Sequence, residues 1–426
     1  MVNVLFIYSK PNLAKNIRYG FSMNIAYAAS ILNDNGFSTF FIDLSCSAYS
    51  LDEIMKYIAD NQISVVAVEF DSFALKRSDN SRSGHDILKA IKQFNMSVKT
   101  IAFGFECIME KRNVEYADIT IVDDVTGSIL SATCSLIEND LCNYKFTQFD
   151  FDSLPFPNRE MIESVKYYGN NHQSTLVQTA KGCLNKCTFC QRQGWQNSYI
   201  AHDIEYVCRE FRLLQEKGYK NVWIIDENFT FNLVRAKELL RQLIKEKSTN
   251  SMKLAISSWT KIDEEFLELG AEANIKVISM GIESANDEVL KFYGKDINLD
   301  EVKALIKYGD GLGIFMVGNF IIGAPMENEQ MIKNTFSYIY ESGLDQVNIK
   351  VLDYMIGSKL YNQLSREQYP LPHYFSCSEN KLGQLPLSQL KHLKDAFLKK
   401  YQKDYNVRLK QKIMKYGMPY YPLVHN

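Results

Sequence analysis

Short apolar segments alternate with helix-like stretches along most of this 426-residue chain, and no other feature limits the fold as strongly. The first third contains five such segments: VNVLFIY, STFFIDL, ISVVAVEF, VKTIAFGF and ITIVDD. Near-continuous apolar runs are typical of strands buried on both faces, and intervening helices connect such strands in parallel. We therefore predict an α/β domain built on a doubly wound parallel sheet over residues 1–145.

Pro155 and Pro157, in the segment FDSLPFPNRE, end this first alternation. Two prolines so close together cannot continue a helix, so we predict an extended linker over residues 146–170. A second alternation follows, with the apolar segments STLVQTA, VWIIDENF, LAISSW, VISMGIES, FMVGNFIIGAP and VNIKVLDY. These strand–helix units predict a partial β/α (TIM-like) barrel over residues 171–370, followed by a short helical segment over residues 371–426.

Charge and apolar run length narrow the class of protein. The formal net charge is −2, which gives no global field that would select nucleic acid. No apolar run reaches the roughly 18 residues that a membrane span needs, and no charged-then-apolar leader opens the sequence. The nine cysteines lack the even framework of a small secreted fold. We expect a cytoplasmic protein that associates neither with membranes nor with nucleic acid.

Three cysteines in the stretch KGCLNKCTFCQRQGW, Cys183, Cys187 and Cys190, are spaced as C-x3-C-x2-C. An iron–sulfur cubane normally takes four thiolates, so a set of three leaves one iron open for a substrate or cosubstrate. The cysteines directly follow the first strand of the second alternation, where the active sites of β/α barrels lie. We predict that they are metal ligands and part of the catalytic site.

A zinc site is the competing interpretation of these cysteines, because two of them form a C-x2-C pair. Structural zinc takes four protein ligands. The nearest further candidates are His172, His202 and Cys208, and none of them belongs to a paired motif. The sequence therefore favours an iron–sulfur cluster over zinc.

The pattern C-x3-C-x-Φ-C, with Phe189 as the aromatic Φ, resembles the signature of the radical S-adenosylmethionine (SAM) enzymes. The resemblance implies that the three thiolates hold a [4Fe–4S] cluster, and that the amino and carboxylate groups of SAM chelate its open iron. A low-potential cluster can then reduce SAM and release a 5′-deoxyadenosyl radical. The electron would come from an external donor such as a flavodoxin or a ferredoxin.

Three later strand ends also resemble parts of this family's SAM site. IIDENF resembles an acidic turn that faces the methionyl ammonium, MGIES resembles a motif whose carboxylate contacts SAM, and IIGAPMEN resembles a turn beside adenine, where glycine allows close backbone approach. The resemblance implies seven SAM-binding residues: Phe189, Asp226, Glu227, Glu283, Ser284, Gly323 and Pro325. Taken alone, a strand-end carboxylate is more often a helix cap.

The order of a sheet domain, an LPFP-type connector and a barrel resembles the radical SAM class with an N-terminal, Rossmann-like cobalamin (B12)-binding domain. Most members of that class methylate unreactive carbon or phosphorus, or rearrange rings. The resemblance implies a cobalamin-dependent C-methyltransferase in biosynthesis or modification. Cobalamin would lie at the carboxyl edge of the first sheet, along five residues: Phe70, Ser72, Gly104, Glu106 and Asp123.

The first domain departs from the motifs of related domains. It lacks the D-x-H-x-x-G with which some cobalamin proteins supply a histidine ligand, and it lacks the G-x-G-x-x-G of dinucleotide-binding domains. Its single histidine, His85 in SGHDIL, is expected to be an ordinary surface residue at a helix start.

Two other functions stay open. One is a cobalamin-free radical SAM enzyme whose first domain recognises the substrate. The other is an iron–sulfur protein used for binding or electron transfer without turnover. No motif names the substrate, which we expect to be a small molecule or a peptide. No second cysteine cluster is present in the sequence, which argues against auxiliary clusters.

Overall fold

The structure is a computed structural model, and it describes residues 2–9, 22–44, 49–70, 78–139, 150–163, 174–194, 198–364, 374–376 and 382–416. The chain divides into two compact units, Met1–His172 and Gln173–Asn426. Each unit contains a parallel sheet with helices along it, so the predicted α/β class is confirmed.

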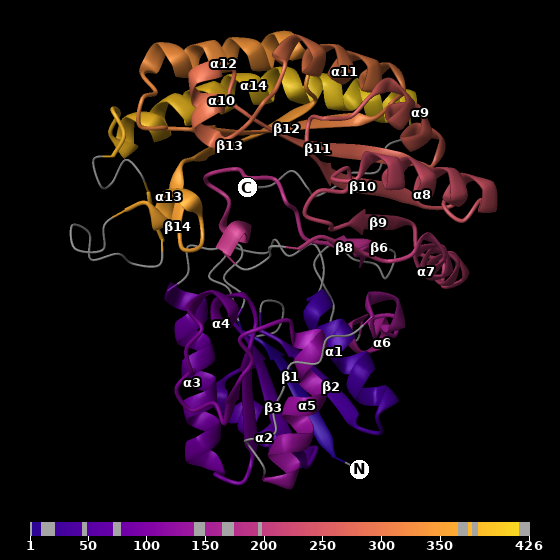
Figure 1. Cartoon of the computed structure of the whole chain (residues 1–426), viewed down its shortest axis with the longest axis vertical. Coiled ribbons are helices and arrows are strands. Elements are labelled where there is room, and N and C mark those ends of the chain that lie inside the picture. The colour runs from indigo at the N-terminus through magenta and orange to yellow at the C-terminus, as the bar shows by residue number, and fades with distance from the viewer. Residues whose placement is uncertain are drawn as a thin grey trace. The chain divides into compact units, whose positions relative to one another are not determined.

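The first unit is built on a five-stranded parallel sheet (Figure 1). Its strands are β1 (Asn3–Tyr8), β2 (Ser38–Asp43), β3 (Ile63–Glu69), β4 (Lys99–Phe103) and β5 (Ile119–Thr120). They pair in the order β2-β1-β3-β4-β5, as predicted for a doubly wound sheet. In this order the winding reverses between β1 and β3, and ligands of such sheets bind outside the carboxyl ends of the strands.

Helices cover both faces of this sheet (Figure 1). The helix α1 (Met23–Asp34) packs beside α5 (Val125–Glu138), and α2 (Leu51–Asp60) packs beside α3 (Ser78–Phe94). The short helix α4 (Phe105–Glu110) begins directly after β4. Apolar residues of α2 and α3 form one buried cluster with those of β1, β2 and β3, which fixes these helices to one face of the sheet.

Side-chain caps determine where two of these helices begin. Ser50 and Glu53 form a reciprocal capping box at the start of α2, and the side chain of Ser22 accepts the backbone N–H of Ile25 at the start of α1. Both caps satisfy amide groups that have no partner within the helix.

The proline-containing segment packs onto the first unit. Ser30 Oγ donates to the carbonyl of Phe156 at 2.7 Å, and the backbone N–H of Asn158 donates to the carbonyl of Ala26 at 3.1 Å. The helix α6 (Arg159–Glu163) follows, and a short 3₁₀ turn at Phe151–Ser153 precedes the prolines. Neither a helix nor a strand is present at the prolines, and the described part of this segment belongs to the first unit.

The second unit is built on a six-stranded, wholly parallel sheet. Its strands are β6 (Ser174–Val177), β9 (Asn221–Ile224), β10 (Lys253–Ser258), β11 (Ile275–Glu283), β12 (Phe315–Ile322) and β13 (Gln346–Val351). They pair in the order β13-β12-β11-β10-β9-β6. Because β6 and β13 lie at opposite edges, the sheet is an open, partial barrel, as the sequence predicts.

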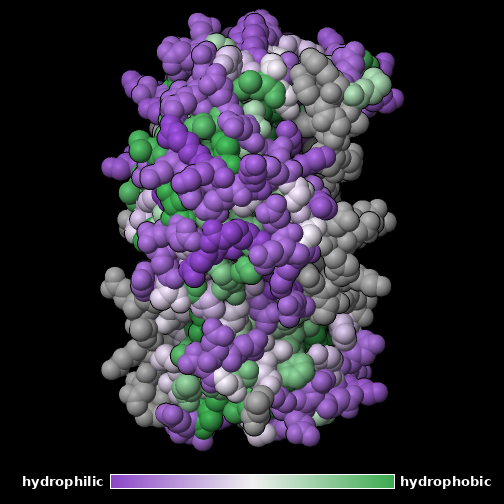
Figure 2. Space-filling view, turned by 90° about the vertical axis from the view of Figure 1, so that its right-hand side faces the viewer, coloured by the Kyte–Doolittle hydropathy of each residue, from purple (hydrophilic) through white to green (hydrophobic). Residues whose placement is uncertain are grey.

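Six helices follow the strands of this barrel, and most of them lie along its outer side (Figure 1). They are α7 (Ile204–Glu216), α8 (Leu233–Glu246), α9 (Glu264–Glu272), α10 (Asp287–Tyr293), α11 (Leu299–Gly311) and α12 (Glu329–Ser342). Hydrophilic residues predominate on the face that Figure 2 shows. The exposed apolar residues include Leu213 on α7 and Val234 on α8. Isolated exposed apolar residues of this kind are normal.

The last part of the chain adds a hairpin and two helices. The strand β14 (Asp353–Met355) pairs antiparallel with β15 (Tyr374–Ser376), and the short helix α13 (Lys359–Asn362) lies between them in the sequence. The long helix α14 (Leu387–Tyr416) contacts β13. Within the described residues, no helix combines the length and the apolar character that crossing a membrane requires.

Candidate active site on the cysteine loop

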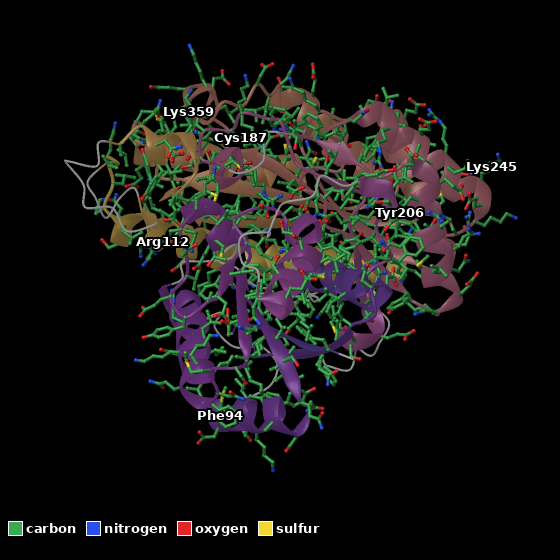
Figure 3. All side chains as sticks on the ribbon, turned by 60° about the horizontal axis from the view of Figure 1, so that its bottom comes forward. Phe94, Arg112, Cys187, Tyr206, Lys245 and Lys359 are labelled. Carbon is green, nitrogen blue, oxygen red and sulfur yellow. The ribbon has the colours of Figure 1, made fainter. Side chains whose placement is uncertain are left out.

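The three motif cysteines lie on one loop closed by a short ribbon. The strand β7 (Ala180–Lys181) pairs antiparallel with β8 (Ile200–Ala201), and the cysteines lie between them. Gly182 begins the loop with φ of +95°, and a Cβ atom there would stand 2.0 Å from the carbonyl oxygen of Ser198. Only glycine fits this position. Figure 3 labels Cys187 on this loop.

The three thiols are half-buried and influence one another electrostatically. Burial raises the pKa of Cys187 to about 11, with Lys295 acting in the opposite direction and Cys190 and Cys183 adding to the rise. Burial also raises the pKa of Cys190. Thiolates in such a place need a bound cation to be stable, and metal ligation supplies one.

The donor set fits an iron–sulfur cluster better than zinc. Three soft thiol donors on one loop match the ligands of such clusters. His202, a candidate fourth ligand for zinc, is buried and stacks on Tyr206 with ring centroids 3.8 Å apart. Cys208 is buried on α7. In the described part of the chain, no three His, Cys, Asp or Glu side chains are already gathered as a metal site.

The second half of the loop is anchored on the carboxyl-terminal end of α10. The N–H of Thr188 donates to the carbonyl of Tyr293 at 3.0 Å, and its hydroxyl donates to the carbonyl of Phe292 at 2.8 Å. The ring of Phe189 meets that of Tyr293 edge to face, with centroids 5.2 Å apart. A Cβ on Gly294 would stand 2.9 Å from the carbonyl oxygen of Lys186.

The first half of the loop is anchored on the acidic turn after β9. Asp226 Oδ1 accepts the backbone N–H groups of Thr179 and Ala180 at 2.7 and 3.1 Å. Glu227 Oε2 accepts the N–H of Gly182 at 2.9 Å, and Glu227 Oε1 pairs with Arg192 at 2.6 Å. Both carboxylates therefore contact the cysteine loop or its base. Their expected contact with the SAM ammonium stays a prediction.

Glu283 forms a buried ion pair that the sequence did not reveal. Its Oε1 lies 3.2 Å from Lys295 Nζ, and the two side chains are 9% and 4% exposed. Burial raises the pKa of Glu283, and Lys295 opposes that rise. Lys295 also lies 4.9 Å from the ring centroid of Trp259, in a cation–π contact. Lys295 follows α10 without any recognisable motif, so only the folded arrangement identifies it.

The remaining predicted SAM contacts differ in what they touch. Ser284 is fully buried, and its hydroxyl accepts the N–H of Asn286 at 3.2 Å. Gly323 has φ of +92°, and a Cβ there would meet a side-chain carbon of Leu390 at 2.8 Å. Pro325 is half-buried in the same turn. The buried Glu327 accepts the N–H of Gly323, and this bond fixes the turn.

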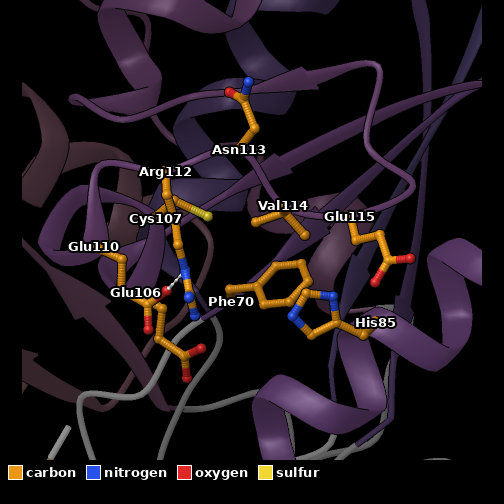
Figure 4. Close-up of a pocket in the computed structure, with 9 residues that line it drawn as sticks. All are labelled: Phe70, His85, Glu106, Cys107, Glu110, Arg112, Asn113, Val114 and Glu115. Atoms are coloured by element: carbon orange, nitrogen blue, oxygen red, sulfur yellow. Dashed lines mark ion pairs between the residues drawn. The ribbon is translucent and has the colours of Figure 1, made fainter.

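A cavity of about 230 Å³ opens at the carboxyl end of the first unit's sheet (Figure 4). It is lined by nine residues: Phe70, His85, Glu106, Cys107, Glu110, Arg112, Asn113, Val114 and Glu115. Two of the residues predicted for the cobalamin edge, Phe70 and Glu106, belong to this lining. Arg112 and Glu110 form an ion pair on one side of it. The cavity mixes aromatic, charged and amide groups.

The other residues predicted for this edge are placed differently. Gly104, with φ of +110°, lies so close to Phe70 that a Cβ would stand 2.8 Å from the Phe70 carbonyl oxygen. Asp123 accepts a hydrogen bond from Ser128 near the start of α5 and does not line the cavity. Ser72 lies outside the described residues.

His85 corrects the expectation of an ordinary surface residue at a helix start. It lies within α3, and its ring meets that of Phe70 edge to face, with centroids 5.3 Å apart. It also lines the cavity. The expectation was wrong because the strand end and the helix that form this cavity are about fifteen residues apart in the sequence, so no local pattern connects them.

Comparison with known proteins agrees with this site. The model of the radical SAM superfamily matches residues 177–339, which include the cysteine loop and strands β9 to β12. The cytidylyl-2-hydroxyethylphosphonate methyltransferase of Streptomyces wedmorensis is 28% identical over 241 residues, covering 52% of this chain and 45% of that protein. An uncharacterised methyltransferase of Pyrococcus horikoshii is 26% identical over 212 residues, covering 49% and 46%. This chain spans about half the length of these curated relatives.

The fold is similar to that of a solved radical SAM methyltransferase. The structure of TsrM from Kitasatospora setae, which has cobalamin and a [4Fe–4S] cluster bound, gives a TM-score of 0.70 at 15% sequence identity. The likeness covers 84% of this chain and 74% of that one, so it extends over both units. With the cysteine loop at the strand ends, the match over residues 177–339 shows that this chain carries a radical SAM domain.

Proposed function

We propose that this chain is a cobalamin-dependent radical SAM methyltransferase that acts on carbon in a small molecule or a peptide. The cysteine loop carries the proposal: its three thiols lie within eight residues, at the strand ends of a radical SAM domain. The cobalamin part is supported by the likeness in fold to TsrM and by the cavity at the carboxyl edge of the first sheet.

The chain's own residues would hold and orient these cofactors. When bound, the cluster would supply the electron that cleaves SAM, and cobalamin would carry the methyl group. Cys183, Cys187 and Cys190 would ligate the cluster, and Phe189 keeps their loop packed against Tyr293. SAM contacts of Glu283, Ser284, Gly323 and Pro325 remain part of the proposal. Phe70 and Glu106, together with His85, would contact cobalamin at the cavity.

The reaction also needs an external reductant, because each reductive cleavage of SAM would take one electron from the cluster. A flavodoxin or a ferredoxin has a suitable potential and would dock as a transient partner. We place the protein in the cytoplasm, where the reducing compartment keeps thiols free to bind iron.

Cofactor binding tests the proposal directly. The protein is purified without oxygen, reconstituted with iron, sulfide and hydroxocobalamin, and desalted. We expect a stable cobalamin spectrum together with the broad absorption of a [4Fe–4S] cluster. Cys187→Ala should lose the cluster and keep cobalamin. The control is Cys134→Ala, which changes a half-buried cysteine on α5, outside the cysteine loop, and should keep both.

Two outcomes would replace the proposal. SAM cleavage by protein that binds no cobalamin would favour the cobalamin-free radical SAM enzyme. An intact cluster that cleaves no SAM in the presence of dithionite would favour the iron–sulfur protein without turnover.

A further inference from the structure

We propose that Asp226 and Glu227 are positioning residues that hold the cysteine loop in the shape that accepts the cluster. The inference rests on the proposed function, because it concerns the cluster that the loop would bind. These two consecutive residues follow β9, and they form hydrogen bonds and an ion pair with the chain on either side of the three-cysteine motif. This is the role that outer partners of metal ligands commonly have.

Asp226 grips the chain before the motif. Its Oδ1 accepts the N–H groups of Thr179 and Ala180, and its Oδ2 accepts the hydroxyl of Thr179 at 2.5 Å. The side chain is buried, with 3% of the residue exposed. Burial alone would disfavour the anion, and it raises the pKa of Asp226 to about 6, while the three donors favour the charged form. Both carboxylate oxygens are thus used within the protein.

Arg235, at the start of α8, also forms hydrogen bonds with the segment at Thr179. Its guanidinium donates to the carbonyl oxygens of Thr179 at 3.2 Å and of His202 at 2.6 Å. The N–H of His202 in turn donates to the carbonyl of Thr179 at 3.0 Å. The residue before β7 and the residue after β8 are therefore hydrogen-bonded to one another. Asp226 and Arg235 connect them to the barrel.

Glu227 grips the chain on both sides of the cysteines. Its Oε2 accepts the N–H of Gly182, immediately before Cys183, and its Oε1 pairs with Arg192, two residues after Cys190. The carboxylate is 9% exposed and Arg192 is 21% exposed, so the pair is largely shielded from water. One side chain thus spans the motif from its first cysteine to its last.

The test compares cluster retention with SAM binding in the same samples. Asp226→Ala, Glu227→Ala and Arg192→Ala are prepared as full chains, reconstituted without oxygen and checked for fold by circular dichroism. Iron release to a chelator is followed at 400 nm, and SAM binding is read from the change it causes in the EPR spectrum of the reduced cluster. Glu265→Gln is the matched control, because Glu265 pairs with Lys237 on the outer helices.

We expect all three variants to release iron about 10- to 100-fold faster than wild type, which is the cost typical of losing an outer partner of a metal ligand. Asp226→Asn, which keeps one acceptor oxygen for the two amides, should recover part of the retention. Glu265→Gln should behave as wild type. SAM should still alter the EPR spectrum of the cluster fraction that remains.

The opposite pattern would overturn the inference. Variants that retain the cluster like wild type but no longer respond to SAM would identify these carboxylates as SAM contacts. Arg192→Ala tests the inference even if Asp226→Ala fails to fold, because it removes the loop's ion-pair partner and leaves Glu227 itself unchanged. Unchanged iron release in Arg192→Ala would also overturn the inference. A wild-type chain that binds no cluster would instead contradict the proposed function itself.

Discussion

The ammonium nitrogen of Lys295 lies 3.2 Å from Oε1 of Glu283, and both side chains are almost fully buried beside the cysteine loop. Glu283 has φ of +70°, which is uncommon for a residue other than glycine, and it lies at a break in the pairing of β11 with β12. Lys295 also donates to the carbonyl of Gly281 at 3.0 Å. The ion pair therefore holds a strained strand end in place, as is common at functional sites.

Lys295→Met should destabilise the chain by about 3–5 kcal/mol, because it leaves the Glu283 carboxylate buried without its cation. Unfolding in urea of the chain without cofactors measures this. The control is Lys333→Met, which breaks an exposed pair with Glu329 one helical turn away and should leave the stability close to that of wild type. The double variant Lys295→Met/Glu283→Gln should regain much of the loss. A single variant as stable as the control would show that the pair does not hold this strand end.

Gly182→Ala should prevent cluster binding. An added Cβ would stand 2.0 Å from the Ser198 carbonyl oxygen, and the backbone there has φ of +95°, so the ribbon under the cysteines must move. Gly218→Ala is the matched control: it also has a positive φ, of +81°, but nothing lies within 4 Å of its Cβ. The control should cost only about 1–2 kcal/mol of stability and keep the cluster. Iron and sulfide content after reconstitution distinguishes the two variants, and equal content would contradict the proposed tight closure of the loop.

The free energy of unfolding should fall as the pH rises from about 4.5 to 7, because of Glu327. Burial raises the pKa of this carboxyl to about 7, against the opposing effect of the Gly323 and Ala324 N–H groups. Since the folded chain holds this proton up to a higher pH than the unfolded chain does, folding weakens between about pH 4.5 and 7, by up to about 3 kcal/mol.

Glu327→Gln should remove that component and be more stable than wild type at pH 8. The relevant quantity is the difference between the two urea-unfolding curves across pH, because Asp226, whose pKa burial also raises, adds a similar trend to both proteins. If the free energies of unfolding of wild type and Glu327→Gln changed with pH in parallel, the pKa of Glu327 would be the same in the folded and unfolded chains.

Lys412→Met should loosen the carboxyl-terminal helix from the barrel. Lys412 Nζ lies 2.5 Å from carboxylate oxygens of both Asp345 and Asp310, and it donates to the carbonyl of Ile314 at 3.1 Å. Asp345 is buried, so loss of the cation leaves it with less compensation. We expect limited proteolysis within α14 to be at least several-fold faster in the variant, whereas Lys394→Met, at a more exposed position of the same helix, should match wild type.

The sequence predicted the features that depend on local pattern. Apolar runs predicted the parallel strands, and the spacing of Cys183, Cys187 and Cys190 predicted a metal-binding loop at a strand end. The parallel strands are confirmed, because strand periodicity is a property of contiguous residues, whereas metal binding by the cysteines stays a prediction. The open barrel is of the same kind.

The features that the sequence could not predict depend on residues brought together by folding. Lys295 can be recognised as an ion-pair partner only once it lies beside Glu283 in the fold. His85 can be recognised as a cavity residue only once its ring contacts Phe70. The motif of Asp226 predicts a SAM contact, which stays a prediction, but it does not reveal the hydrogen bonds of Asp226 to Thr179, forty-seven residues earlier. No pattern in a single chain records such pairings, and none identifies the substrate.

Formation of 5′-deoxyadenosine tests the central claim most directly. The reconstituted chain is incubated without oxygen with SAM and dithionite, and the product is measured by mass spectrometry, with Cys187→Ala and Cys134→Ala in parallel. We predict that wild type and Cys134→Ala form 5′-deoxyadenosine and that Cys187→Ala forms none. Absence of the product from wild type with an intact cluster would contradict the account.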